Sequence, residues 1–271
     1  MGKRKNLQSS IDDEERDLID EKMRGISFED NGVENIKAYS NYLKTLSYKL
    51  NIKCKNEKQK EYLKLLKDPS KKIVLANGSP GTGKSYLSDS YALKALKEGD
   101  FQKVIICTPL IQSTTMPVGI LPGSFQEKVF MHEMTEKRNF TKILQDSDNT
   151  SPEFITNALF YGGQINFEFV NYLRGVTLSN SLILVAEAEN FSIDDILLIL
   201  TRIGDKSKIV ISGDELQVDR NDIKKNTKGS GLNYAIEKLK DMESVGVINF
   251  GPDDVVRNPL ITEILKKWYA K

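Results

Sequence analysis

The feature that most constrains this sequence is a glycine-rich turn between an apolar run and a helical pattern. The apolar run begins at Ile73, the turn reads GSPGTGKS over residues 78–85, and the helical pattern continues to Leu96. This order of strand, turn and helix is the arrangement of a phosphate-binding loop. Backbone N–H groups wrap a polyphosphate where side chains do not obstruct them, and the following helix directs its positive dipole end at the same anion. The turn therefore predicts a site for a triphosphate.

Each position of the turn has an expected part in that site. Lys84 is expected to reach the β- and γ-phosphates, and the hydroxyl of Ser85 is expected to ligate Mg²⁺. The remaining binding positions are Gly78, Ser79, Pro80, Gly81, Thr82 and Gly83. The alternative is a glycine turn that only joins a strand to a helix.

Length and composition indicate an ordinary globular chain with one sizeable domain and an appendage. The 271 residues are 39% hydrophobic and 28% charged. No apolar run approaches the roughly 18 residues of a membrane span, and the first residues lack the apolar core of a secretory signal. A cytoplasmic protein without a membrane partner is therefore expected. Cys54 and Cys107 lack a metal-type spacing and are expected to be free thiols, and the single histidine, His132, has no second ligand near it.

Apolar runs alternate with helical patterns along most of the chain. The expected strands are the run from Ile73, then Val104–Cys107, Gln164–Val170, Leu182–Val185, Lys208–Ser212 and Ser244–Phe250. Beside the helix after the turn, the expected helices are Asn56–Leu66, 125–144, Pro152–Phe160, Ser192–Ile203, Gly231–Met242 and Leu260–Tyr269. Apolar strands that alternate with helices indicate a parallel sheet covered on both faces.

The start of the chain is expected to be an appendage to this domain. Residues 1–32 are highly charged and contain a possible short helix from Ile11 to Arg24. Apolar residues at helical spacing predict a packed helix over Asn35–Leu50. The expected organisation is a charged tail with helices over 1–50 and a nucleotide-binding domain over 51–271.

Carboxylates that follow the strands are candidates for metal and water chemistry. A nucleoside triphosphatase needs an acid at the end of a strand beside its phosphate loop, and LILVAEAEN is placed to supply it. Ala186 ends that strand where an Asp is expected for the metal, which leaves Glu187 as the water-orienting base. The loss of a metal carboxylate is expected to slow hydrolysis far more than it weakens binding. Asp214 or Glu189 is an alternative source of that carboxylate.

Two further polar positions are placed to contact a nucleotide. Gln59 lies upstream of the first strand, and its amide can present one donor and one acceptor to adenine. A solvated helix glutamine is the alternative. Asp214 and Gln217 follow a strand at the edge where the triphosphate is expected, as in a phosphate sensor, although a Gly-Asp turn after any strand gives the same pattern.

Six segments agree in order and spacing with those of a known family. They are GSPGTGKSYL, VGILPGSFQEK, YLRGVTLSNSLILVAEAEN, LTRIGDKSKIVISGDELQVD, SGLNYAIEKLK and VVRNPL. From about Gln59 to its end, the chain resembles the PhoH family, single RecA-like ATPases related to superfamily 1 helicases. The resemblance implies an α/β fold, that of a RecA-like P-loop NTPase with a mainly parallel sheet sandwiched between helices and a short helical N-terminal segment. It also implies ATP and Mg²⁺ as cofactors.

The resemblance also implies roles for single residues. Gln59 looks like the adenine-reading glutamine, Glu187 like the catalytic acid and Gln217 like the γ-phosphate sensor. Arg257, in VVRNPL, resembles the arginine finger of the family, whereas from the sequence alone it is a helix-start arginine. A lone RecA-like domain has no second domain to supply that arginine, so a homo-oligomeric ring, expected to be a hexamer, would supply it from a neighbouring subunit. Arg174 and Thr177 match the family as well.

Two positions depart from the family pattern. The sequence has Thr108-Pro109-Leu110 where the family has Thr-Arg-Pro, so a basic contact is missing. Ala186 replaces the metal-binding Asp, known as the Walker B Asp. Natural drift in a divergent, phage-type member and an engineered nucleotide trap both account for the second departure.

Single-stranded RNA or DNA is the expected partner, although the net charge of +1 argues neither for nor against it. The loop Thr108–Gly123 and the lysines Lys224, Lys225 and Lys228 offer a basic surface for a nucleic-acid backbone, with solvated charged loops as the alternative. The resulting prediction is a helicase-related, nucleic-acid-dependent ATPase whose hydrolysis is impaired by Ala186, in the host cytoplasm if a phage encodes it. The alternative is an ATP-loaded scaffold or switch without unwinding activity. Small-molecule phosphotransfer is disfavoured, because no lid arginine cluster follows the turn.

Overall fold

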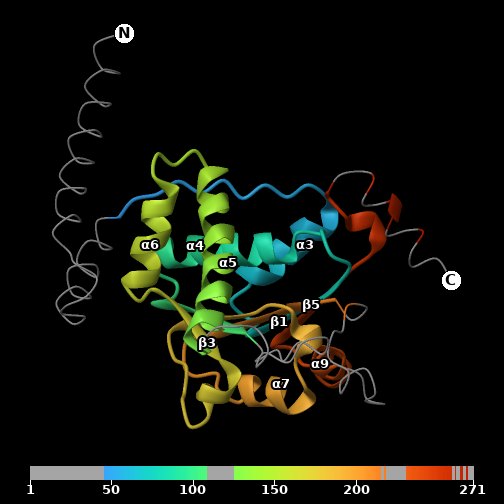
Figure 1. Cartoon of the computed structure of the whole chain (residues 1–271). Coiled ribbons are helices and arrows are strands. Elements are labelled where there is room, and N and C mark those ends of the chain that lie inside the picture. Colours follow the sequence, from blue (N-terminus) through green and yellow to red (C-terminus); the bar gives the residue numbers. More distant parts are fainter. Residues whose placement is uncertain are drawn as a thin grey trace, which may run out of the picture. The chain divides into compact units, whose positions relative to one another are not determined.

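A six-stranded parallel sheet lies between two layers of helices in the computed structural model (Figure 1). The structure describes residues 46–108, 125–214, 217, 230–257, 260, 263, 264 and 267, with the backbone alone for 125–132. The strands are β1 (Ile73–Gly78), β2 (Lys103–Thr108), β3 (Ile165–Phe169), β4 (Ser181–Val185), β5 (Lys208–Gly213) and β6 (Val245–Phe250). Their order across the sheet is β3-β2-β4-β5-β1-β6, and every neighbouring pair is parallel. This arrangement confirms the expected α/β fold of a RecA-like P-loop NTPase.

Helices cover both faces of the sheet, as the alternation of strands and helices predicts (Figure 1). One face carries α3 (Glu57–Lys67), α4 (Lys84–Glu98), α5 (Phe125–Gln145) and α6 (Pro152–Tyr161), and the other carries α7 (Ile193–Leu200) and α9 (Gly231–Leu239). The 3₁₀ turn η1 (Val170–Leu173) follows β3, η2 (Ala188–Asn190) follows β4, and η4 (Pro252–Asp254) follows β6. Ser192 begins α7 through a capping box with Asp195, which satisfies N–H groups that the first helical turn leaves unpaired.

The core forms because successive side chains of a strand point to opposite faces of the sheet. Leu75, Ile183 and Ile211 belong to a buried cluster with residues of α7 and α9, among them Ile196 and Leu232. Their neighbours along the strands, which include Val74, Leu182 and Val210, are buried toward the opposite face. A strand that is buried on both faces needs apolar residues throughout, which explains the continuous apolar runs of the sequence.

The parallel order brings the ends of several strands to one edge of the sheet. The glycine turn follows β1, Ala186 and Glu187 follow β4, and Asp214 follows β5. Because β5 lies between β1 and β4, all three segments emerge side by side at the carboxyl edge. In open α/β sheets, ligands bind outside this edge.

The helix predicted over Asn35–Leu50 is wrong where the structure tests it, because residues 46–50 are not helical. The hydroxyl of Tyr48 donates to the carbonyl of Leu93 at 2.7 Å. The side chain of Asn149 accepts from the backbone N–H of Lys49 at 2.8 Å and donates to its carbonyl at 2.9 Å. The ammonium of Lys97 on α4 donates to the carbonyl of Tyr48. Side chains from α4 and from the turn after α5 thus pair with backbone groups of this segment, which a helix would pair internally.

Several predictions lie outside the described residues. These are the N-terminal tail with its helix from Ile11 to Arg24, the part of the second predicted helix before residue 46, the loop over 109–123, Lys224, Lys225, Lys228 and most of the C-terminal helix. The boundary between residues 50 and 51 stays a prediction. Cys54 and Cys107 are free thiols, as expected. Within the described ranges, no helix has both the length and the apolar character that crossing a membrane requires.

Lys208 offers a test of how the sheet holds α3. Its buried ammonium donates to the carbonyls of Leu66 and Asp68 at the end of that helix, and burial lowers the pKa of Lys208 to about 8. Lys208→Met is expected to lower the free energy of unfolding by about 2 kcal/mol, because the last carbonyls of α3 lose their donor. Urea unfolding followed by circular dichroism measures the change. Lys64→Met, exposed on the same helix, is the control, and equal stability of the two variants would show that Lys208 does not hold α3.

Candidate functional site

The glycine turn holds a conformation that side chains would prevent. Gly78 has a φ of 143°, and a Cβ there would lie 2.2 Å from the carbonyl oxygen of Phe250. Gly83 has a φ of 86°, and its Cβ would lie 2.7 Å from Nε2 of Gln59. No side chain caps the N-terminus of α4, so its first N–H groups face the turn without a side-chain acceptor. This is the chemistry of an anion site at a helix N-terminus.

Lys84 lies at the start of α4 with only 9% of its surface exposed. Its ammonium donates to the carbonyls of Gly78 at 2.6 Å and of Ser79 at 3.0 Å. Burial lowers the pKa of Lys84, whereas the negative charges of Asp214 and Glu189 act in the opposite direction. The lysine therefore lies between the carbonyls of the turn and the acids that follow β4 and β5.

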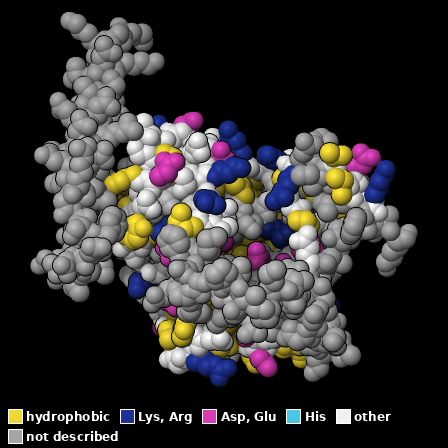
Figure 2. Space-filling model, viewed as in Figure 1, with side chains coloured by type: hydrophobic (Ala, Val, Ile, Leu, Met, Phe, Trp, Pro, Cys, Tyr) yellow, Lys and Arg dark blue, Asp and Glu magenta, His cyan; other side chains and the backbone are white. Residues whose placement is uncertain are grey.

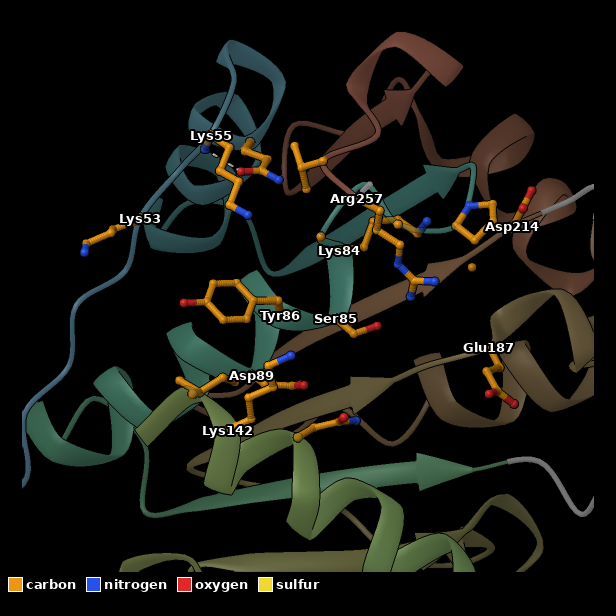
Figure 3. Close-up of a pocket in the computed structure, with 18 of the residues that line it drawn as sticks. Lys53, Lys55, Lys84, Ser85, Tyr86, Asp89, Lys142, Glu187, Asp214 and Arg257 are labelled. Carbon is orange, nitrogen blue, oxygen red and sulfur yellow. Dashed lines mark hydrogen bonds between the residues drawn. The ribbon is translucent and has the colours of Figure 1, made fainter. Parts of the chain in front are cut away.

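A cavity of about 810 Å³ opens in front of the turn (Figure 3). Among the predicted residues that line it are Gln59, Pro80, Gly81, Gly83, Lys84, Ser85, Glu187, Asp214, Gln217 and Arg257. The cavity also has walls from the segment before α3 and from α5, including Lys53, Lys55 and Lys142. Figure 2 shows Lys and Arg side chains around a hollow on this face. A polyanion therefore has basic side chains on several sides of the cavity.

The acids of the site have different environments. Glu187 is exposed, and its φ of 53° lies in the left-handed region that non-glycine residues rarely adopt. Glu189 is buried, its Oε2 accepts from the backbone N–H of Asp214 at 2.9 Å, and burial raises the pKa of Glu189 to about 7. A Cβ on Gly213 would lie 2.4 Å from that oxygen. Ala186, between β4 and Glu187, contributes no oxygen to this group.

Gln59 supports the turn with both ends of its amide. Its Oε1 accepts from the N–H of Lys55 at 2.6 Å, and its Nε2 donates to the carbonyl of Thr82 at 2.8 Å. Only 3% of the residue is exposed, which excludes the solvated helix glutamine. One amide hydrogen and one lone pair remain for another partner. The contact with adenine stays a prediction.

Arg257 reaches the cavity of its own chain. The preceding residue, Val256, donates its N–H to the carbonyl of Gly81 at 3.0 Å, and a Cβ on Gly81 would lie 2.8 Å from Cδ of Arg257. In Figure 3 the guanidinium extends toward Ser85 and Glu187. Its supply by a neighbouring subunit stays a prediction. Gln217 also lines the cavity, whereas Arg174 and Thr177 are exposed residues that do not.

Two acids near the cavity were missed at the level of sequence. Asp89, on α4, lines the cavity with 6% of its surface exposed, and Glu136 comes from α5. Burial raises the pKa of both carboxyls, and the charge of Glu136 raises that of Asp89 further. The sequence indicates a position near the cavity for Asp89, because it lies four residues after Ser85 on the same face of the helix. No comparable signal links Glu136 to the turn.

The oxygen donors of the site suit Mg²⁺, which prefers hydroxyl, carboxylate, phosphate and water ligands. Ser85 is exposed in the wall of the cavity, and Asp214 and Glu189 follow the adjacent strands. No group of three or more His, Cys, Asp or Glu side chains within the described residues could hold a metal by itself. A cation here would therefore need phosphate oxygens as well as Ser85.

Comparison with known proteins shows which family this chain is similar to. The family model described as PhoH-like protein matches residues 51–269. A PhoH-like protein of Bacillus subtilis (strain 168) is 33% identical over 217 residues, which cover 80% of this chain and 64% of that protein. A PhoH-like protein of Synechocystis is 31% identical over 219 residues (80% and 62%), and Protein PhoH of Escherichia coli (strain K12) is 29% identical over 221 residues (79% and 57%). The chain spans about three fifths of the length of these relatives.

The raised pKa of Glu189 predicts a pH-dependent stability. Between the ordinary value of 4.5 and about 7, the folded protein holds a proton that the unfolded chain releases, so this group's contribution to stability falls as pH rises. From pH 5 to pH 8, the unsubstituted protein is expected to lose about 1–3 kcal/mol more of its unfolding free energy than Glu189→Gln loses, because the variant has no carboxyl to ionise. Urea unfolding at both pH values measures it, with exposed Glu243→Gln as control. A difference between Glu189→Gln and the unsubstituted protein that is the same at both pH values would contradict the assignment.

Proposed function

The chain belongs to the PhoH-like protein family, and we propose that it binds ATP with Mg²⁺ and is a helicase-related, nucleic-acid-dependent ATPase whose hydrolysis is slowed by Ala186. The observation that carries this proposal is the cavity in which the uncapped start of α4 and the buried Lys84 meet Glu187, Gln217 and Arg257. Fold alone does not select a function, so the proposal rests on these side chains.

Binding uses backbone groups first and side chains second. The N–H groups of the turn and of α4 would surround the phosphates, and Lys84 would exchange its carbonyl partners at Gly78 and Ser79 for phosphate oxygens. When bound, Mg²⁺ neutralises charge on the β- and γ-phosphates. Ser85 is the residue placed to hold it. The remaining donor and acceptor of the Gln59 amide are available to adenine.

Hydrolysis would use the residues at the edge of the sheet. Glu187, exposed and facing the cavity, would orient the attacking water, Gln217 would contact the γ-phosphate, and Arg257 would stabilise charge in the transition state. The methyl group of Ala186 can neither bind the cation nor accept a hydrogen bond from its hydration shell. Without a carboxylate at residue 186, the residues of this chain would stabilise the transition state less, which would slow hydrolysis more than it would weaken binding.

A second candidate function follows from the same Ala186. A protein that holds ATP for long periods fits a scaffold or switch that binds a protein or a nucleic acid without unwinding. Single-stranded RNA or DNA as partner, and a homo-oligomeric ring that is expected to be a hexamer, are parts of the first proposal. Solution mass measured with and without ATP and Mg²⁺ tests the ring. A monomer under every condition would remove the ring, but Arg257 would keep its contact with its own chain's turn.

Restoring the acid tests the motor directly. Ala186→Asp is expected to raise the rate of ATP hydrolysis at least about 10-fold, with little change in ATP affinity, because the gain concerns the transition state. Phosphate release is measured with and without single-stranded RNA and DNA, followed by duplex unwinding. Lys84→Ala is the control and is expected to lose ATP binding. If neither RNA nor DNA stimulates ATP hydrolysis by either form, the nucleic-acid-dependent ATPase is excluded and the ATP-loaded scaffold remains as the function.

Mixing two inactive variants tests where Arg257 acts. In the Ala186→Asp background, Arg257→Ala and Lys84→Ala are each expected to lose most hydrolysis, about 100-fold or more. The contact of Arg257 with Gly81 of its own chain predicts that a mixture of the two proteins stays inactive. Phosphate release from the mixture is the measurement. Recovery of activity would show that a neighbouring subunit supplies the arginine, as in a ring.

A further inference from the structure

Asp89 is a buried carboxyl in the wall of the nucleotide cavity that the mechanism above does not use. It lies on α4, four residues after Ser85, with 6% of its surface exposed. Residues four apart on a helix share one face, and helical side chains lean toward the N-terminus of the helix. The carboxyl of Asp89 is therefore directed along α4 toward Ser85 and the turn. Figure 3 shows both residues on one side of the cavity, with Glu187 across from them.

Asp89 forms no ion pair in the part of the chain that the structure describes, although Lys142 of α5 lines the same cavity. The hydroxyl of Ser88 donates to the Asp89 carboxyl at 3.5 Å, a long hydrogen bond, and burial together with the charge of Asp89 raises the pKa of Tyr62 on α3. The charge of Glu136 acts on Asp89 from α5, and the charge of Glu187 acts on Glu136. A buried carboxyl with a second, half-buried carboxyl near it carries its negative charge at a cost, which a shared proton or a cation relieves.

The cavity also lacks the strand-end carboxylate that is expected at residue 186. The side chain of Ala186, directly after β4, has no oxygen, although Ser85 and residues of the phosphate turn line the cavity. The acids at the strand ends do not fill this gap freely, because Glu189 is already bonded to the backbone of Asp214. Asp89 thus offers a carboxyl from the helix side of the cavity, whereas residue 186 offers none from the strand side.

We propose that Asp89 takes the place of the absent strand acid and accepts hydrogen bonds from the hydration shell of the Mg²⁺ that Ser85 and the phosphates hold. This inference rests on the proposed function, because it requires a nucleotide in the cavity. Mg²⁺ keeps several of its waters in most protein sites, so a carboxylate one helical turn from Ser85 acts without direct coordination. Asp89 is in this sense a positioning residue. The cation also allows Asp89 to ionise, which releases the proton that burial and Glu136 otherwise retain.

The test measures how Mg²⁺ changes the affinity for a fluorescent, non-hydrolysable ATP analogue. Asp89→Asn keeps the size of the side chain and removes its charge. Mg²⁺ is expected to increase the affinity for the analogue, and Asp89→Asn is expected to need about 10-fold more Mg²⁺ for half of that increase. The affinity measured in EDTA, without Mg²⁺, is expected to be the same in both proteins. Glu98→Gln removes an exposed charge at the far end of α4 and is expected to change neither value. Titrations in buffers of different ionisation enthalpy are expected to show a proton released with Mg²⁺, and Asp89→Asn is expected to abolish that release.

A double variant separates this role from a structural one. Ala186→Asp in the Asp89→Asn background is expected to restore the Mg²⁺ dependence, because the cation regains a carboxylate from the strand side. A structural role for Asp89 would not produce that rescue. An unchanged Mg²⁺ dependence in Asp89→Asn overturns the inference and leaves a proton shared with Glu136 as the function of the pair. Failure of the unsubstituted protein to bind the analogue overturns the proposed function and this inference together, whereas tight binding without any effect of Mg²⁺ overturns the inference alone.

Discussion

The site depends on a close approach between two backbone segments, the end of β1 and the end of β6. Because β1 pairs with β6 up to Gly78 and Phe250, the turn leaves the sheet against a carbonyl oxygen that admits no Cβ. Glycine at this position lets the chain turn at once and directs the N-terminus of α4 at the cavity. The parallel pairing of β1 with β5 then sets Asp214 beside the turn. Strand β4 lies on the other side of β5, so Glu187 follows next along the same edge. The positions of the turn, Glu187 and Asp214 therefore result from sheet register.

Much of this arrangement could be predicted from the sequence, because its causes are local or periodic. The glycine turn predicted the places of Lys84 and Ser85, and the apolar runs predicted six strands within a residue or two. Contacts between distant segments were not predictable in this way. Residues 46–50 carry a helical pattern, yet Lys97 of α4 and Asn149 of the turn after α5 pair with the backbone of that segment. The partners of Gln59 and the approach of Glu136 to Asp89 likewise depend on how α3, α4 and α5 pack.

The acids around Lys84 show how position changes the chemistry of one functional group. Glu187 is exposed on a strained residue, whereas Glu189 is bonded to the backbone of the next strand and titrates near neutral pH. Asp89 is buried and Glu136 is half-buried among helices, where a lone negative charge is costly. A cavity that receives a polyphosphate and a divalent cation contains both kinds of charge at once. Carboxyls with different pKa values allow the total charge to adjust as ligand and metal enter.

The amide of Gln59 also has a mechanical consequence. It joins the backbone before α3 to the carbonyl of Thr82, and the same backbone is anchored to α4 through Tyr48. Residues 48–59 thus connect α4 to the phosphate turn, through Tyr48 at one end and Gln59 at the other. A displacement of the backbone at Lys55 would therefore reach the carbonyl of Thr82 through the side chain of Gln59.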